Sequence, residues 1–317
     1  MHAEPQDHAH TPAHQHAPRS DGPQEGHQGH AHQNHGGHDH HGEPDWSALA
    51  VLLEREGELN SPAFTQAAQW LRELQNNAAV GRVLDVGSGP GVVAGVLAEA
   101  FPAAEVVAVD GSPALLERAR TRSAGRLSTQ QADLPAEFDR LGTAGLIWSS
   151  NAVHHLGDQQ AALTALAGAL RPGGLLAVSE RGLPLRFLPR DIGLGRPGLQ
   201  ARLDAAHEDA FAAMRAQLPG AVDEVEDWPA MLAAAGLAPA GSRTFLAEWP
   251  APLGLPGREH LHTQLSRRRD QLGELLDAAD REALDALLDR EAPTGILARP
   301  DAFYLTAITV HTARKAG

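Results

Sequence analysis

The clearest structural signal in this chain of 317 residues is Val83-Leu84-Asp85-Val86-Gly87-Ser88-Gly89-Pro90-Gly91. A short apolar run ends in alternating glycines, and a helix-compatible segment at 92–100 follows. The pattern predicts a buried strand, a tight loop and a helix, in that order. Glycine allows a positive φ and lets a ligand approach the backbone, and a helix N-terminus suits an anionic or carboxylate group. We therefore interpret this segment as a ligand-binding loop.

Predicted strands and helices alternate around this loop. Strands are predicted at residues 80–86, 105–109, 126–130, 144–148 and 175–179. Helices are predicted at residues 92–100, 113–122 and 159–170. This alternation is typical of βαβ units and a parallel sheet covered on both faces. With two further strands predicted at 242–249 and 302–311, we expect a Rossmann-like, doubly wound α/β fold with a mostly parallel, seven-stranded sheet.

Composition divides the chain into three regions. Residues 1–44 hold most of the 18 histidines and few apolar residues, which predicts a disordered tail. Residues 45–79 are expected to form two helices, the second with Ser61 as its N-cap and Pro62 as its first helical residue. Residues 80–317 are expected to form the α/β domain.

Two segments, 182–220 and 251–300, interrupt the alternation. Both carry helical patterns, so we expect packed helices there instead of long loops. Ligands bind beyond the carboxyl ends of the strands in such sheets. These helical insertions, together with the helices of 45–79, are therefore expected to form a lid over the site.

Composition also excludes several classes of function. The formal net charge is −14, whereas nucleic-acid binding depends on basic residues, so no nucleic-acid partner is expected. The chain has no cysteine, which excludes disulfides, thiolate catalysis and cysteine-ligated metals. No apolar run approaches the roughly 20 residues that span a bilayer, and no secretory signal is recognisable. We expect a cytoplasmic protein with no membrane partner.

The motif Asp85-x-Gly87-x-Gly89-x-Gly91 resembles the first motif of class I S-adenosylmethionine-dependent methyltransferases. In that family the loop contacts the amino acid part of the cofactor. The segment 106–113 resembles the second-strand motif, whose terminal acid holds the ribose hydroxyls. Gln131-Ala132-Asp133-Leu134 resembles the segment where an acid reads the adenine amino group and the next residue packs on the ring.

Two further segments extend the resemblance over roughly residues 80–180. Residues 148–156 resemble the fourth-strand motif, which often ends in His-His-Leu, and 170–174 resemble the turn before strand five. The chain departs from the family where Phe138-Asp139 is followed by four further residues before the next apolar run. The resemblance implies S-adenosylmethionine as cofactor. The cofactor-binding residues that it implies are Asp85, Gly87, Ser88, Gly89, Gly91, Asp110, Gly111, Ser112, Asp133, Leu134, Ser149 and Asn151.

Catalytic and substrate residues are less clearly indicated. His154 and His155 follow the fourth predicted strand, where either could act as a base or contact the substrate, or could instead cap or pack the next helix. Arg181 and Arg186 lie in the first insertion and could grip a carboxylate or phosphate, or could simply be solvated. We expect one of these arginines and one of these histidines to face the pocket.

The histidine-rich tail indicates a separate property. Imidazole binds Zn, Ni and Cu readily, so residues 1–44 are expected to bind such ions. The spacing is irregular and gives no closed tetrahedral site. The candidate ligands are His27, His30, His32, His35, His38, His40 and His41.

The favoured function is methyl transfer to a small-molecule acceptor by in-line displacement under the lid. A metal-handling or binding protein that uses the tail is an alternative. An NAD-dependent oxidoreductase is a weaker alternative, because a Gly-x-Gly-x-x-Gly fingerprint counted from Gly87 meets Val92 at its third glycine. The acceptor atom and the oligomeric state are left open by the sequence.

Overall fold

The computed structural model describes residues 46–76, 80–180 and 182–317, and all of them belong to one compact unit, Pro44–Gly317. The predicted tail, its candidate metal ligands and Arg181 lie outside the described residues. The α/β unit carries every other residue to which the sequence assigned a role.

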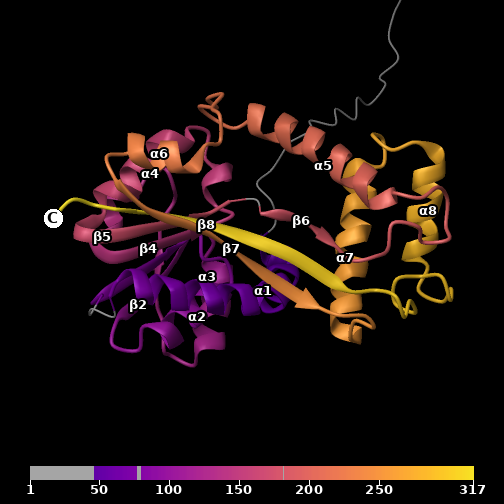
Figure 1. The fold of residues 1–317 in the computed structure, drawn as a ribbon, viewed down its shortest axis with the longest axis horizontal. Helices are drawn as coiled ribbons and strands as arrows, with labels where there is room; N and C mark the ends of the chain where they lie inside the picture. The colour runs from indigo at the N-terminus through magenta and orange to yellow at the C-terminus, as the bar shows by residue number, and fades with distance from the viewer. Residues whose placement is uncertain (1–45, 77–79, 181) are drawn as a thin grey trace, which may run out of the picture. The chain divides into compact units, whose positions relative to one another are not determined.

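Eight strands form a single sheet (Figure 1). They are β1 (Arg82–Val86), β2 (Glu105–Asp110), β3 (Ser128–Gln131), β4 (Ala144–Ser150), β5 (Leu170–Ser179), β6 (Leu183–Arg186), β7 (Ala238–Trp249) and β8 (Tyr304–Arg314). Their order is β3-β2-β1-β4-β5-β8-β6, with β7 paired to β8 off this path. Strands β1 to β5 are parallel, and β8 runs antiparallel to its neighbours. The predicted doubly wound α/β fold is confirmed.

The eighth strand, β6, is absent from the sequence prediction, which placed only a helical insertion after β5. The reason lies in the length of β8. One edge of β8 pairs with β7 along its whole length, but on the other edge β5 reaches only His311–Arg314. The remaining edge of β8 is free to pair, and β6 occupies it through Leu183 and Arg186.

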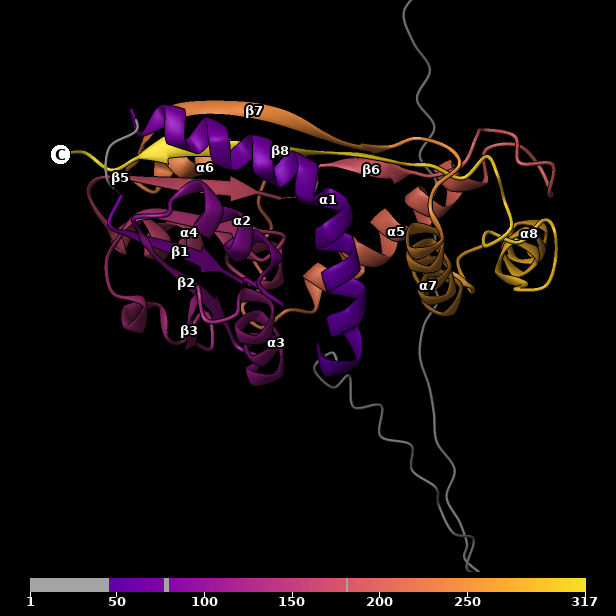
Figure 2. The same cartoon turned by 90° about the horizontal axis from the view of Figure 1, so that it is seen from below.

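Helices cover both faces of the sheet (Figures 1 and 2). One face packs against α1 (Trp46–Leu74), α2 (Val92–Ala100) and α3 (Pro113–Ser123), and the other against α4 (Gln159–Gly168) and α6 (Trp228–Ala234). Successive side chains of a strand point to opposite faces of the sheet. In β1, Val83 packs in the core on the side of α1, α2 and α3, and Leu84 packs in the core on the side of α4 and α6. Both are fully buried, as expected for an inner strand of a parallel sheet.

The prediction of two helices in 45–79 is wrong. Residues Trp46–Leu74 form one helix with Pro62 inside it. Proline removes one backbone hydrogen bond and bends a helix, and Figure 2 shows α1 turning near its middle. The helix continues beyond Pro62 because Ala63, Phe64 and Ala67 are buried against the sheet. The Ser61-Pro62 signal thus marks a bend and not a helix start.

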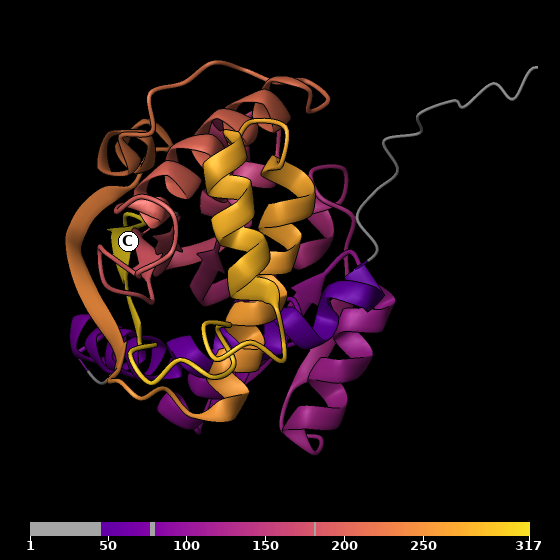
Figure 3. The same cartoon turned by 90° about the vertical axis from the view of Figure 1, so that its right-hand side faces the viewer.

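Three more helices lie within the two interrupting segments. They are α5 (Leu199–Ala216), α7 (Leu255–Leu272) and α8 (Ala278–Leu288). The carboxyl ends of the parallel strands point toward α1, α5 and α7 (Figure 2). Seen from that end, α7 and α8 stand in front of the sheet (Figure 3). The space beyond the strand ends is therefore flanked by helices from distant parts of the chain.

Candidate functional site

The glycine loop connects β1 to α2 at the switch point of the sheet, where β2 and β4 flank β1 on opposite sides. Gly87 and Gly89 have φ values of +74° and +52°. A Cβ on Gly87 would lie 2.3 Å from the Cβ of Ala152, so packing excludes a side chain there. A Cβ on Gly89 would meet nothing within 4 Å. The loop is thus closely packed at its start and open over Gly89, as a cofactor-binding loop requires.

Asp110, at the end of β2, joins this loop to the next one. Its Oδ2 accepts a hydrogen bond from the Gly89 N–H and its Oδ1 accepts one from the Ser112 N–H, each at 2.9 Å. Ser112 in turn caps α3 by accepting from the Leu115 N–H at 3.4 Å. Burial raises the pKa of Asp110, while these two backbone bonds favour the ionised form. The carboxylate is therefore held in place between two loops at the strand edge.

Asp85 is a buried acid with an incomplete set of hydrogen bonds. Its side chain is almost fully enclosed, with 2% of the residue exposed. Its Oδ2 has no hydrogen-bond partner among the described residues. Burial is the main reason that the pKa of Asp85 is raised to about 7. A hydrogen bond with the Ala94 backbone opposes this rise, and the charge of Asp110 adds to it. A buried carboxylate oxygen without a partner is costly, so Oδ2 of Asp85 is a candidate acceptor for a bound ligand.

We predict that Asp85→Asn stabilises the ligand-free protein at pH 8. The folded pKa of about 7 exceeds the ordinary value of 3.8, so the folded state binds more protons between these values. Stability therefore falls as the pH rises through this window. Asparagine cannot ionise, so the variant should not lose stability in this way. We expect its free energy of unfolding at pH 8 to be higher by about 2–4 kcal/mol, given about 1.4 kcal/mol for each unit of pKa. Urea unfolding at pH 5 and pH 8 measures it.

The matched control is Asp139→Asn, because Asp139 is an exposed acid away from the glycine loop. It should leave the difference in unfolding free energy between the two pH values unchanged. If Asp85→Asn showed the same pH dependence as the wild type, Asp85 would not be the buried acid that we describe. The same variant should also weaken cofactor binding.

The other predicted cofactor residues lie at neighbouring strand ends. The Ala132 N–H donates to the Asp110 carbonyl at 3.1 Å, which brings Asp133 and Leu134 beside β2. Asp133 is exposed and Leu134 is half-buried. Ser149 is buried, and its Oγ has no partner among the described residues. Asn151 has a φ of +49° and donates its N–H to the Ser179 carbonyl at 2.9 Å.

The sequence left open which of the two histidines could act as a base. His154 is buried, and its Nδ1 lies 2.6 Å from Oε2 of Glu180. The other oxygen of Glu180 accepts the N–H groups of Ala152 at 2.9 Å and Val153 at 2.8 Å. This carboxylate therefore orients the imidazole and also fixes the turn that carries it. A histidine that donates Nδ1–H to a carboxylate presents its Nε2 lone pair to a substrate.

Glu180 is a residue that the sequence interpretation missed. It follows β5 immediately and its side chain is completely buried. The available signal was an acid that comes directly after an apolar strand, β5. Its neighbour in the sheet, β4, is the strand that leads to His154. The carboxyl ends of adjacent parallel strands meet at one edge, so the two side chains could have been expected to lie close together.

The C-terminal part of α5 packs onto the turn that carries the histidines. Arg215 donates to the carbonyls of His154 and Leu156, each at 2.7 Å. The ring of Phe211 lies 5.3 Å from the His154 ring in an edge contact. The rings of His154 and His155 lie 4.2 Å apart. The first insertion is thereby connected directly to the candidate base.

Arg186 forms an ion pair with Asp204 of α5. Arg268 of α7 reaches the same acid at 3.4 Å. The predicted substrate contact of Arg186 would therefore have to compete with Asp204. Its predicted partner in that role, Arg181, lies outside the described residues.

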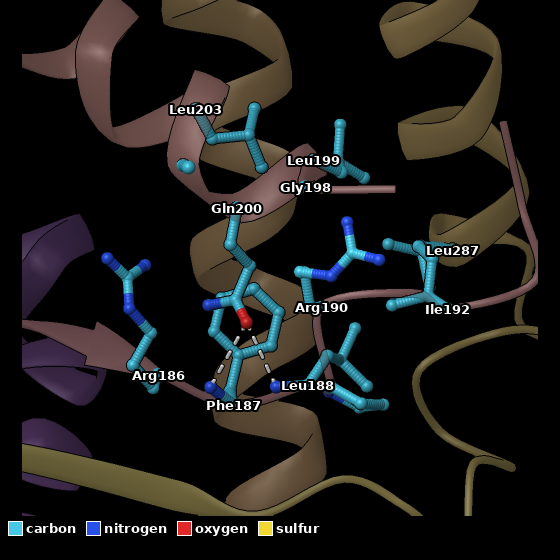
Figure 4. Close-up of a pocket in the computed structure, with 12 residues that line it drawn as sticks. Arg186, Phe187, Leu188, Arg190, Ile192, Gly198, Leu199, Gln200, Leu203 and Leu287 are labelled. Atoms are coloured by element: carbon cyan, nitrogen blue, oxygen red, sulfur yellow. Dashed lines mark hydrogen bonds between the residues drawn. The ribbon is translucent and has the colours of Figure 1, made fainter. Parts of the chain in front are cut away.

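A cavity of about 250 Å³ lies between β6, α5 and α8 (Figure 4). Its walls are mainly apolar, with Leu188, Ile192 and Leu287 among them, and Arg186 and Arg190 add positive charge. Gln200 closes one side by accepting the Leu188 N–H at 3.1 Å. None of the residues that line it belongs to the glycine loop. The cavity is therefore separate from the loop to which the sequence assigns the cofactor.

Two negative findings concern the described residues only. Within 46–76, 80–180 and 182–317, no cluster of three histidine or acidic side chains is arranged to hold a metal ion. In the same part of the chain, no helix combines the length and the apolar character that crossing a membrane requires.

Comparison with known proteins identifies the family. Residues 83–174 match a family described as a methyltransferase domain. Trans-aconitate 2-methyltransferase of Methylobacterium radiotolerans is 33% identical over 195 residues, which cover 58% of this chain and 71% of the relative. The protein of the same name from Paracidovorax citrulli is 31% identical over 183 residues, which cover 56% of this chain and 65% of the relative.

Solved structures of low sequence identity were also found. A Haemonchus contortus phosphoethanolamine N-methyltransferase, in complex with phosphomonomethylethanolamine and S-adenosylhomocysteine, is 17% identical with a TM-score of 0.42. The match covers 78% of this chain and 51% of that one.

Proposed function

We propose that this chain, which belongs to the class I S-adenosylmethionine-dependent methyltransferase family, methylates a small-molecule acceptor with His154 as the base. The observation that carries the proposal is the buried pair of His154 and Glu180 at the strand edge that also holds the glycine loop. The base and the cofactor loop thus come from neighbouring strands of one sheet.

Three features of the loop fit S-adenosylmethionine. The space over Gly89 is open, so a ligand could pass close to the backbone. Asp110 ends the strand beside it with a fixed carboxylate, which would accept hydrogen bonds from the ribose hydroxyls. The unpartnered Oδ2 of Asp85, on β1 two residues before Gly87, would be a further acceptor beside the loop. When bound, the cofactor supplies an electrophilic methyl group on a sulfonium.

His154 would prepare the acceptor. Because its Nδ1 is engaged by Glu180, its Nε2 can take the proton of an acceptor O–H or N–H group. The acceptor atom, freed of its proton, would then be held as a nucleophile toward the methyl group that the cofactor would supply. Glu180 balances the charge of the imidazolium that results. The residues of the chain thereby align the reactants and hold the proton.

The names of the curated relatives support a small-molecule acceptor. Four of them carry the name trans-aconitate 2-methyltransferase, and trans-aconitate is a small carboxylic acid. The test is a methyl-transfer assay with purified protein over a panel of small acids, alcohols and amines. Methylation of at least one member is expected, and for an alcohol or amine it should depend on His154, which would take the acceptor proton. If every member stayed unmethylated while S-adenosylhomocysteine bound normally, the proposal of a small-molecule acceptor would fail.

Metal binding by residues 1–44 is proposed from their composition alone. We predict that deleting these residues changes the melting temperature by no more than about 2 °C, because they contain few apolar groups. The affinity for S-adenosylhomocysteine should stay the same, and Ni²⁺ binding measured by calorimetry should largely disappear. Loss of the folded state on deletion would show that the segment has a structural role.

A further inference from the structure

His260, on α7, is a buried histidine without hydrogen bonds. Only 3% of the residue is exposed, and neither Nδ1 nor Nε2 has a partner among the described residues. Leaving a buried polar group unpaired costs free energy, so such a group calls for an explanation. An imidazole that packed as an ordinary core residue would bond at least one ring nitrogen.

The groups around His260 come from two other elements, β8 and α1. The Tyr304 ring of β8 meets it edge to face at 6.3 Å. The Tyr304 hydroxyl donates to Oδ1 of Asn60 on α1 at 3.0 Å, and the Asn60 amide N–H groups make no further hydrogen bond in the described part of the chain. Burial and the nearby Arg55 lower the pKa of His260 to about 4. The imidazole is therefore neutral and offers one N–H donor.

Charges near this cluster favour an anion. The Arg55 guanidinium of α1 makes no ion pair within residues 46–76, 80–180 and 182–317. Two acids lie nearby. Glu54, whose pKa Arg55 helps to lower, is already paired with Arg118. Glu56 accepts from Gln264 at 3.4 Å, and burial raises its pKa, which favours its neutral form. Arg268 lies near Glu56 and opposes that rise. The unpaired groups are thus mostly donors, beside a guanidinium that forms no ion pair within the described residues.

The cluster lies close to the strand ends. Phe64 follows Asn60 by one turn of α1, a rise of about 6 Å. The Phe64 ring meets the Trp148 ring edge to face at 6.3 Å. Trp148 is the register partner of Asp85 in the β1–β4 pair. One helical turn and one ring contact therefore separate Asn60 from the end of β1.

We propose that His260, Asn60 and Arg55 bind a carboxylate of the acceptor, so that the substrate class is a small carboxylic acid. This inference rests on the proposed function and extends it. The carboxylate would receive hydrogen bonds from the imidazole and the Asn60 amide and would face the Arg55 guanidinium. The reacting atom of the same molecule would then lie toward His154. The unsatisfied nitrogens of His260 are explained as a preformed binding site.

The test is His260→Leu in the full chain, with trans-aconitate as the probe. Calorimetric titration into protein saturated with S-adenosylhomocysteine should show wild-type binding and a loss of at least about tenfold in the variant. The affinity for S-adenosylhomocysteine should change less than about twofold. The melting temperature should stay the same or rise, because an apolar side chain replaces an unsatisfied polar one.

The matched control is His262→Leu, on the same helix. His262 Nε2 contacts the Leu288 carbonyl at 3.0 Å and faces a different neighbour. This variant should lose stability and keep its affinity for trans-aconitate. If His260→Leu failed to fold, His260→Asn and Asn60→Ala would test the same contacts.

Two results would overturn the inference. One is a wild-type protein that binds neither trans-aconitate nor any other small carboxylate while it binds S-adenosylhomocysteine. The other is an unchanged affinity for the probe in His260→Leu. Neither result removes the proposed function, which fails only if the panel assay detects no small-molecule methylation.

Discussion

Replacing His154 with alanine is expected to lower kcat by about 10²–10⁴-fold, the usual contribution of a general base. The Nε2 that would take the acceptor proton is lost, whereas the residues around Gly89 and Asp110 keep their geometry. The affinity for S-adenosylhomocysteine should therefore change less than about twofold. Steady-state kinetics with a methylated acceptor from the panel, together with calorimetry, measure both quantities.

Two variants sharpen this prediction. Glu180→Gln keeps the shape of the side chain but removes the charge that stabilises an imidazolium, so it should lower kcat in the same direction. His155→Ala removes an exposed neighbour and should leave kcat within about threefold. An unaltered kcat in His154→Ala, or an equal loss in His155→Ala, would contradict the assignment of the base.

Replacing Asp110 with alanine is expected to weaken S-adenosylhomocysteine binding by about 10²–10⁴-fold. Two charge-assisted hydrogen bonds to the ribose would be lost, each worth about 1.5–3 kcal/mol. The same carboxylate holds the N–H groups of Gly89 and Ser112, so the loop would also be less well fixed. Calorimetric titration of the folded variant measures the loss.

The control for Asp110→Ala is Asp139→Ala, which removes an exposed acid between β3 and β4. It changes the net charge equally and should leave the affinity unaltered. A similar affinity in wild type and Asp110→Ala would place the ribose elsewhere. Circular dichroism of both variants separates loss of binding from loss of the fold.

The sequence predicted the α/β core because its signals are local. The strand, loop and helix around Gly87 and Gly89 follow from apolar runs and glycines within ten neighbouring positions. The bend at Pro62 could not be predicted in this way, because it depends on whether residues beyond it find a buried surface. Strand β6 was also hidden, since it exists only where β5 leaves one edge of β8 free.

The parts of the candidate site that lie within short family motifs could be predicted from the sequence. The parts formed by residues far apart in the chain could not. The loop and Asp110 could be identified from short motifs. The pairing of His154 with Glu180 depends on two strands being neighbours, and the pattern did not identify the acid. His260, Asn60 and Tyr304 come from three elements far apart in the chain, and none of them carries a motif.

The most direct test of the account follows the methyl group itself. The full chain is incubated with methyl-labelled S-adenosylmethionine and a metabolite extract filtered to remove macromolecules, and the products are separated by size. We predict label in a low-mass product, lost in Asp110→Ala and greatly reduced in His154→Ala. Label that enters only protein or nucleic acid when these are supplied, and no small molecule from the extract, would contradict the account.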